Sequence, residues 1–242
     1  MGNDLKCVII DFFGLPGCGK STISHLLAGR INYRDVFEPS YISDHYWTAN
    51  KRKIVKAMRT LYVALRFNKV IRGMISIIKA NQIEDLHTLI SEVINISDKT
   101  YSILKKANSD CYIMFDEGIA QAAISLSLNQ KRSSLQNYNE LLRVIGLRRE
   151  NILLVYLDEE ISTALVRMEK RTSNDSRVEK TNNIELKNSI MKGYLSGAEK
   201  LKSRTNIWLQ KENENKIDYI YDQVLEFEQK RRPDERENTS CD

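Results

Sequence analysis

The stretch Gly14-Leu15-Pro16-Gly17-Cys18-Gly19-Lys20-Ser21 decides the fold of this 242-residue chain, because it satisfies the pattern G-x-x-x-x-G-K-[ST] at every position. Residues 5–13, directly before it, are apolar and rich in β-branched and aromatic types, which predicts a buried parallel strand. Residues 20–30, directly after it, carry apolar side chains at helical spacing. Since a glycine-rich turn between a strand and a helix is the context of a phosphate-binding loop, a chance match is the weaker interpretation.

Each part of this motif suits the binding of phosphate. Glycines let the backbone fold tightly, so that successive N–H groups point at an anion, and the following helix adds its positive N-terminal end. The Lys20 ammonium can bridge the β- and γ-phosphates, and the Ser21 hydroxyl can ligate Mg²⁺. We therefore expect ATP and Mg²⁺ as cofactors. The residues expected to bind them are Gly14, Pro16, Gly17, Cys18, Gly19, Lys20, Ser21 and Thr22.

Apolar segments farther along the chain predict four more strands, at residues 35–37, 111–115, 152–157 and 217–221. Helical patterns separate them, with a long helix over 184–211 and a last helix over 223–232. Alternating strands and helices predict an α/β fold of three layers, with a five-stranded parallel sheet flanked by helices. We expect one domain over residues 1–232, with a helical insertion at about 47–107, and a disordered polar tail over 233–242.

Two carboxylates follow predicted strands, at the edge of a parallel sheet where ligands gather. Asp116 ends the strand 111–115 and would face the metal, directly or through water, if that strand lies beside the first one. The less favoured alternative is that it caps the next helix. Glu38 follows the brief strand 35–37 and could accept a proton from an acceptor hydroxyl, or it could belong to an ordinary turn. Nearby, Trp47 could stack on a flat base or pack in the core.

Three arginines predict a lid over the transferred phosphate. Arg167 and Arg171 are four residues apart on a predicted helix, so they share a face. Arg177 lies across a polar loop, which gives a lid at about 167–180. Arginines on a mobile lid can neutralise the charge of a transferring phosphoryl group. The alternative is a solvated basic face.

On these residues the chain resembles the nucleoside and nucleotide monophosphate kinases, especially the thymidylate kinase and deoxynucleoside kinase group. The matching pieces span most of residues 5–221: the loop 14–21, Glu38-Pro39, Trp47, Asp116-Glu117 and the arginines of the lid. The resemblance implies a kinase fold, transfer of the ATP γ-phosphate to a small acceptor, and a base or substrate contact at Glu38. The family commonly has Arg after the acidic residue of its third strand, whereas here Glu117 follows Asp116. Residues 115–121 look more like thymidylate-kinase-like ATPases that occur with surface-polysaccharide genes, so the acceptor is left open among nucleosides, nucleotides, sugars and polyols.

Residues 47–83 form a basic amphipathic stretch, with nine Lys and Arg residues and no acidic residue. Such helices can lie on an anionic membrane, bind a nucleic-acid backbone or line the channel of an anionic substrate. The simpler alternative packs the apolar face on the protein and leaves the basic face in water. The sequence also leaves a homodimer open.

Composition narrows the classes of function. The net charge of +5 suits phosphate ligands, and the four cysteines and three histidines show no spacing typical of a metal site or catalytic triad. No signal peptide is evident, so a cytoplasmic location is expected. Two functions stay in view: a small-molecule kinase, or a regulatory switch ATPase whose basic helices engage a membrane, nucleic acid or protein.

Overall fold

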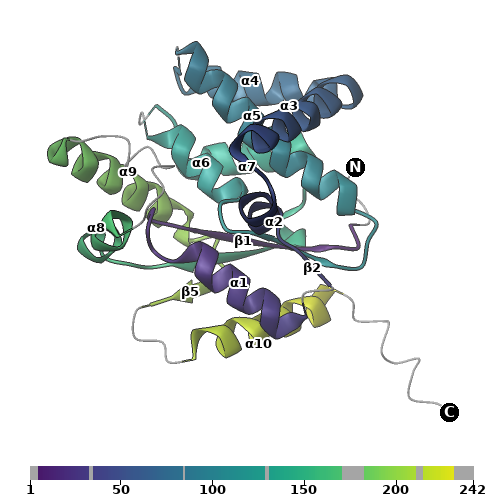
Figure 1. Ribbon diagram of the computed structural model, residues 1–242, viewed down its shortest axis with the longest axis vertical. Coiled ribbons are helices and arrows are strands. Elements are labelled where there is room, and N and C mark those ends of the chain that lie inside the picture. The colour runs from purple at the N-terminus through teal and green to yellow at the C-terminus, as the bar shows by residue number, and fades with distance from the viewer. Residues whose placement is uncertain are drawn as a thin grey trace.

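The computed structural model describes residues 5–32, 35–83, 85–128, 131–170, 183–210 and 215–231. Within them, five strands form one sheet, and all pairs are parallel. The order across the sheet is β2-β3-β1-β4-β5 (Figure 1). The strands are β1 (Val8–Gly14), β2 (Val36–Phe37), β3 (Tyr112–Phe115), β4 (Ile152–Leu157) and β5 (Ile207–Leu209). The predicted α/β fold with a five-stranded parallel sheet is therefore confirmed.

The central strand β1 is buried along its whole length, as its apolar composition predicts. It pairs with β4 on one side and with β3 on the other, where Asp11 lies opposite Phe115. The carboxyl ends of β1 and β3 therefore lie next to each other. This satisfies the condition under which Asp116 would face the phosphate-binding loop.

Helices cover both faces of the sheet (Figure 1). On one face α1 packs against α10 and against β1 and β3, while α10 also contacts β5. The opposite face is covered by α6 and α9, which contact β1, and by α7 and α5, which pack on α6. These helices span Lys20–Ile31 (α1), Leu86–Lys106 (α5), Ile119–Ser127 (α6), Ser134–Ile145 (α7), Ile184–Lys202 (α9) and Lys216–Arg231 (α10). Two short helices, α2 (Pro39–Tyr46) and α8 (Ile161–Glu169), follow β2 and β4.

The basic stretch between β2 and β3 contributes α3 (Ala49–Arg66) and α4 (Asn68–Ala80), which precede α5. Helix α4 packs on α5 and α7, and α3 packs on α5, so α3 lies at the outside of the molecule, at the top of Figure 1. None of the helices in the described ranges is long and apolar enough to cross a membrane.

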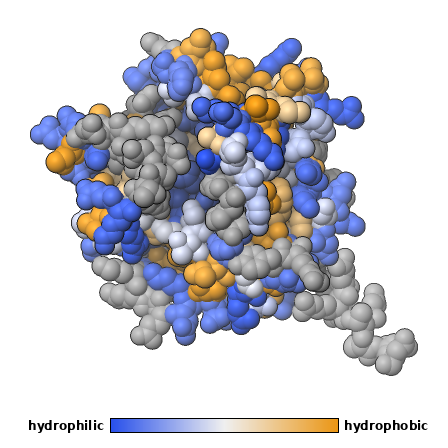
Figure 2. Space-filling view, viewed as in Figure 1, coloured by the Kyte–Doolittle hydropathy of each residue, from blue (hydrophilic) through white to orange (hydrophobic). Residues whose placement is uncertain are grey.

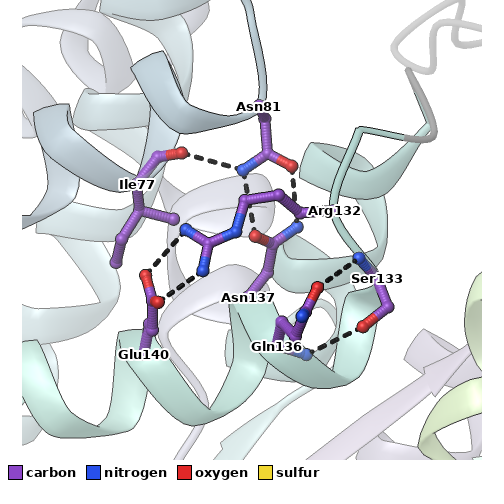
Figure 3. Close-up of polar contacts among 7 residues, drawn as sticks. All are labelled: Ile77, Asn81, Arg132, Ser133, Gln136, Asn137 and Glu140. Carbon is purple, nitrogen blue, oxygen red and sulfur yellow. Dashed lines mark hydrogen bonds and ion pairs between the residues drawn. The ribbon is translucent and has the colours of Figure 1, made fainter.

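A pair of buried amides joins the end of α4 to α7 (Figure 3). The Asn81 amide donates to Asn137 Oδ1 at 2.9 Å and the Asn137 amide donates to Asn81 Oδ1 at 3.1 Å. Asn81 also donates to the carbonyl of Ile77. Both side chains are fully buried, so this paired arrangement leaves little freedom for α4 to slide along α7.

The prediction of the last strand is wrong. Residues 217–221 lie inside helix α10, while the fifth strand is Ile207–Leu209, within the stretch predicted as the end of a long helix. Helix α9 ends earlier, at Lys202. In α10 the side chains of Ile220 and Val224 are fully buried at a spacing of four, which is the period of a helix rather than a strand.

Candidate active site

The phosphate-binding loop joins the carboxyl end of β1 to the first turn of α1. Gly17 has φ +84°, and a Cβ there would collide with the carbonyl oxygen of Ala164 in α8, so glycine is required for both reasons. Gly19, at φ +96°, occupies the N-cap of α1. The loop therefore packs tightly against α8 and presents the N-terminus of α1, which favours a bound anion.

Lys20 lies folded over its own loop. Its side chain is buried, and the ammonium donates to the carbonyl oxygens of Gly14 at 3.3 Å and Leu15 at 2.8 Å. A buried ammonium that is hydrogen-bonded in this way is compensated for loss of water.

Ser21 and Asp116 meet across the neighbouring ends of α1 and β3. The Ser21 hydroxyl donates to Asp116 Oδ2 at 2.7 Å. The other carboxylate oxygen, Oδ1, is buried and has no hydrogen-bond partner among the described residues. A hydroxyl and a carboxylate with a free, buried lone pair are hard oxygen ligands that fit Mg²⁺, which typically binds one or two carboxylates and completes its shell with water and phosphate.

A buried carboxyl group beneath this site, that of Asp11 in β1, anchors the segment that carries Asp116. Asp11 Oδ2 accepts the backbone N–H of Ala120 at 2.9 Å, in the first turn of α6. A Cβ at Gly118 would overlap the Asp11 carboxyl, so only glycine permits this approach. Burial raises the pKa of Asp11 to about 7, although the backbone N–H of Ala120 opposes the shift. At the next residue of α6, Gln121 Oε1 accepts the N–H of Gly14 at 3.3 Å, which ties α6 to the loop.

Neither Asp11 nor Gln121 was predicted as a site residue from the sequence. A charged residue inside an otherwise apolar parallel strand was the available signal for Asp11, because such a group must have a reason to be buried. Gln121 had no signal of its own, since a single Gln in a helix is ordinary.

Glu38 is buried at the end of β2 and is held by α1. Ser24 Oγ donates to Glu38 Oε1 at 3.0 Å, and His25 Nδ1 lies 3.2 Å from Glu38 Oε2. Ser24 is one helical turn beyond Lys20, so it shares the face of α1 that looks toward the loop. The structure thus brings Glu38 to the helix that begins at the phosphate-binding loop, through two partners that were not predicted from the sequence.

Arg167 of α8 reaches the phosphate-binding loop. Its guanidinium forms an ion pair with Glu159 at 2.7 Å and lies 3.5 Å from the carbonyl oxygen of Cys18. Its side chain is 47% exposed, which leaves the guanidinium accessible to a ligand. Arg171 and Arg177 lie outside the described residues, as does most of the predicted lid at 167–180 and the tail at 233–242.

Trp47 is engaged by the basic helix that follows it. The Arg59 guanidinium lies 5.3 Å and the Lys51 ammonium 5.7 Å from the centre of its ring. These are cation–π contacts with α3, and the Trp47 side chain is half-buried, so it is not a core side chain.

Comparison with known proteins supports the fold. No family model matches the chain, and no curated protein sequence matches it. Among solved structures, it is similar to a deoxyadenosine kinase from M. mycoides, with a TM-score of 0.52 over 90% of this chain and 100% of that one. At 16% sequence identity this similarity is informative about architecture only. The chain thus shares the fold of that deoxyadenosine kinase.

Proposed function

We propose that this chain is an ATP-dependent phosphotransferase that moves the γ-phosphate of ATP to a small-molecule acceptor. The observation that carries the proposal is the Ser21–Asp116 contact beside the phosphate-binding loop, with one buried carboxylate oxygen unpaired among the described residues. Lys20 and Arg167 both reach carbonyl oxygens of the same loop. Two cations would therefore lie beside the proposed Mg²⁺ ligands and the proposed phosphate site.

Each residue has a distinct role in this proposal. Lys20 and Arg167 neutralise charge on the transferring phosphoryl group, and the backbone of residues 14–19 holds the phosphates. Mg²⁺, held by Ser21 and Asp116, would neutralise the charge of the β- and γ-phosphates. Arg171 and Arg177 are proposed to join Arg167 on a lid that closes over the loop and excludes water.

Glu38 is the proposed base at the acceptor side. An acceptor hydroxyl must lose a proton as it attacks the γ-phosphorus, and a carboxylate within hydrogen-bond reach can take it. Contacts from Ser24 and His25 fix the orientation of this carboxylate. Binding an acceptor there requires that one of these contacts give way or that the acceptor approach a remaining lone pair of the carboxylate.

The acceptor class is best sought first among deoxynucleosides. The structurally similar protein is described as a deoxyadenosine kinase with the products dCMP and a flexible dCDP bound. The departure at Glu117, where the resembling kinases commonly have Arg, keeps sugars and polyols as the next acceptors to test.

The test is an acceptor screen with a matched pair of variants. ADP release would be measured with MgATP and deoxynucleosides, nucleosides, their monophosphates, sugars and polyols, for the wild type, Lys20→Ala and Lys192→Ala. Lys192 is exposed on α9, so its replacement controls for loss of one positive charge. Acceptor-dependent release that is lost only in Lys20→Ala supports the kinase. Slow hydrolysis that no acceptor stimulates would favour the switch ATPase, whose partner surface would then be the basic helices.

A further inference from the structure

Helix α3 turns an apolar stripe toward solvent. Ile54, Met58, Leu61 and Leu65 are 61, 66, 59 and 79% exposed, and their spacing of four, three and four places them on one face of the helix. At about 1.5 Å per residue, the stripe is about 16 Å long. Figure 2 shows apolar residues gathered at the end of the molecule where Figure 1 places α3 and α4.

The helix is attached to the protein through its other, more polar side. Arg59 pairs with Asp98 of α5 at 2.6 Å, and the two side chains are only 15 and 16% exposed. Lys56 donates to Asn95 of α5 at 3.5 Å, and Val63 is fully buried. The simpler expectation for this stretch, with its apolar face packed inward and basic face in water, is therefore wrong for α3. Four large apolar side chains in one exposed row indicate a surface that binds a partner or a membrane.

The charge around the stripe is positive. Lys51, Lys53 and Arg66 are exposed on α3 itself, and Lys69 and Arg72 are exposed on the adjoining α4. Residues 47–83 contain no acidic side chain that could offset them. An occupant must therefore offer an apolar surface bordered by negative charge.

We propose that the α3 stripe docks on an anionic lipid surface. A helix of this kind lies in the plane of the interface, with its aliphatic face among the acyl chains and its cations at the headgroups. Lysine and arginine at the border can bury their methylene stems while the charged ends reach lipid phosphates. The proposal does not rest on the kinase activity, and it would place that activity at a membrane surface.

A second copy of the chain fits this surface less well. A two-fold interface brings the same patch of both subunits together and so must be self-complementary. Pairing two α3 helices would bring their cations together without a carboxylate from residues 47–83 on either side. A nucleic-acid backbone fits less well too, because phosphates would satisfy the cations and leave the aliphatic row in water.

The test is flotation with vesicles of phosphatidylcholine alone and with about 30% phosphatidylserine. We expect the wild type to bind the anionic vesicles at least about tenfold more tightly, with binding that weakens as salt increases. Leu61→Gln/Leu65→Gln should lower that binding about a hundredfold, since it removes two aliphatic side chains that would be buried in the lipid interface. Lys51→Gln/Lys53→Gln/Arg66→Gln should lower it by a similar factor at low salt.

Matched control variants distinguish binding through the α3 stripe from nonspecific binding of exposed apolar or charged residues to vesicles. Ile184→Gln/Leu186→Gln replaces two exposed apolar residues of α9, and Lys192→Gln/Lys200→Gln removes two exposed charges there. Both controls should float like the wild type. Since the replaced side chains are largely in water, circular dichroism should show a change in melting temperature of no more than about 2 °C for each variant. Equal flotation of the stripe variants and the wild type would overturn the proposal. So would a concentration-dependent dimer abolished by Leu61→Gln/Leu65→Gln without vesicle binding.

Discussion

The phosphate-loop edge of the sheet and the outer helix α3 place polar and apolar side chains in opposite ways. At the loop, the ionisable side chains of Asp11, Lys20 and Glu38 are buried, and all three are hydrogen-bonded. The two carboxyl groups accept hydrogen bonds from α6 and α1, and the ammonium donates to carbonyl oxygens of the loop. In α3, aliphatic side chains stand in water while Arg59 points inward to Asp98. Both arrangements cost free energy in the isolated chain, one through desolvated polar groups and the other through exposed apolar surface.

This difference indicates where to look for ligands. Two buried carboxyl oxygens near the loop, Asp11 Oδ1 and Asp116 Oδ1, have no hydrogen-bond partner among the described residues. The raised pKa of Asp11 allows its oxygen to hold a proton, whereas Asp116 beside Ser21 suits a small, hard ligand such as Mg²⁺. The exposed apolar surface of α3 suits a large apolar partner instead, such as a lipid surface. Variants on each side of the molecule can test this contrast.

The largest expected effect is at Lys20. Lys20→Ala should lower acceptor-dependent ADP release at least about a thousandfold, or ~4 kcal/mol in transition-state stabilisation, because the ammonium acts on charge that develops during transfer. Steady-state assays of this variant beside Lys192→Ala would measure it. A loss of less than about tenfold would mean that the loop binds nucleotide without stabilising its transfer.

The second prediction concerns Asp11 and pH. The pKa of Asp11 is raised from its ordinary value of 3.8 to about 7 in the folded chain, so the folded chain binds more protons than the unfolded chain between about pH 4 and pH 7. Its contribution to stability is therefore lost as pH rises through this window, by up to about 4 kcal/mol. In Asp11→Asn this dependence should disappear.

Urea unfolding of the wild type and Asp11→Asn from about pH 4 to about pH 8 would measure the difference. Asp222→Asn, at an exposed carboxyl of α10, is the matched control and should follow the wild type. Parallel curves for the wild type and Asp11→Asn would show that Asp11 does not carry the proton.

Third, Asp116→Asn should raise the Mg²⁺ concentration needed for half-maximal activity about a hundredfold, since it replaces a charged oxygen ligand by a neutral one. Titration of Mg²⁺ at saturating ATP checks this. Glu117→Gln changes the exposed neighbouring carboxylate and should leave the Mg²⁺ dependence unchanged. Equal shifts in both variants would contradict a specific ligand role for Asp116.

Fourth, the free energy of unfolding can test whether α3 packs through its polar face and exposes its aliphatic face. Arg59→Leu leaves the largely buried Asp98 without its partner and should cost about 2 kcal/mol in the free energy of unfolding. Leu61→Gln/Leu65→Gln should change it by less than about 0.5 kcal/mol, because these side chains are already exposed. The reverse ranking in urea unfolding would mean that α3 packs through its aliphatic face.

The smallest effect is expected at Arg167. Arg167→Gln should lower the turnover number about tenfold with little change in stability, because its guanidinium lies at the loop but is half exposed and one of three proposed lid arginines. Arg148→Gln, which also breaks an exposed ion pair with a glutamate, is the control. An unchanged turnover number would assign Arg167 only to its contact with Glu159.

Local signals in the sequence predicted most of the sheet and the loop. The motif at residues 14–21 and the apolar strands around it depend on short-range chemistry, so their positions followed from the residues alone. The wrong predictions for β5, which was expected as helix, and for the start of α10, which was expected as strand, show the limit of such signals. Ile217 and Tyr221 are types favoured in strands, yet the buried Ile220 and Val224 follow helical spacing and decide the outcome.

Contacts between distant segments could not be predicted in this way. Gln121 reaches Gly14 across 107 residues. Ser24 and His25 meet Glu38 only because β2 pairs with β3, which α1 contacts. Helical periodicity in α3 also predicts that the helix is amphipathic without predicting which face packs inward. That choice depends on α5, where Asp98 and Asn95 offer partners to the basic side chains of α3.

The most direct test of phosphate transfer is to follow the γ-phosphate itself. ATP labelled at the γ-phosphorus would be incubated with Mg²⁺, the wild type or Lys20→Ala, and the acceptor that most stimulates ADP release. The proposal predicts that the label appears on the acceptor in a one-to-one ratio with ADP, and only with the wild type. Label recovered solely as inorganic phosphate, at a rate that no acceptor changes, would contradict it.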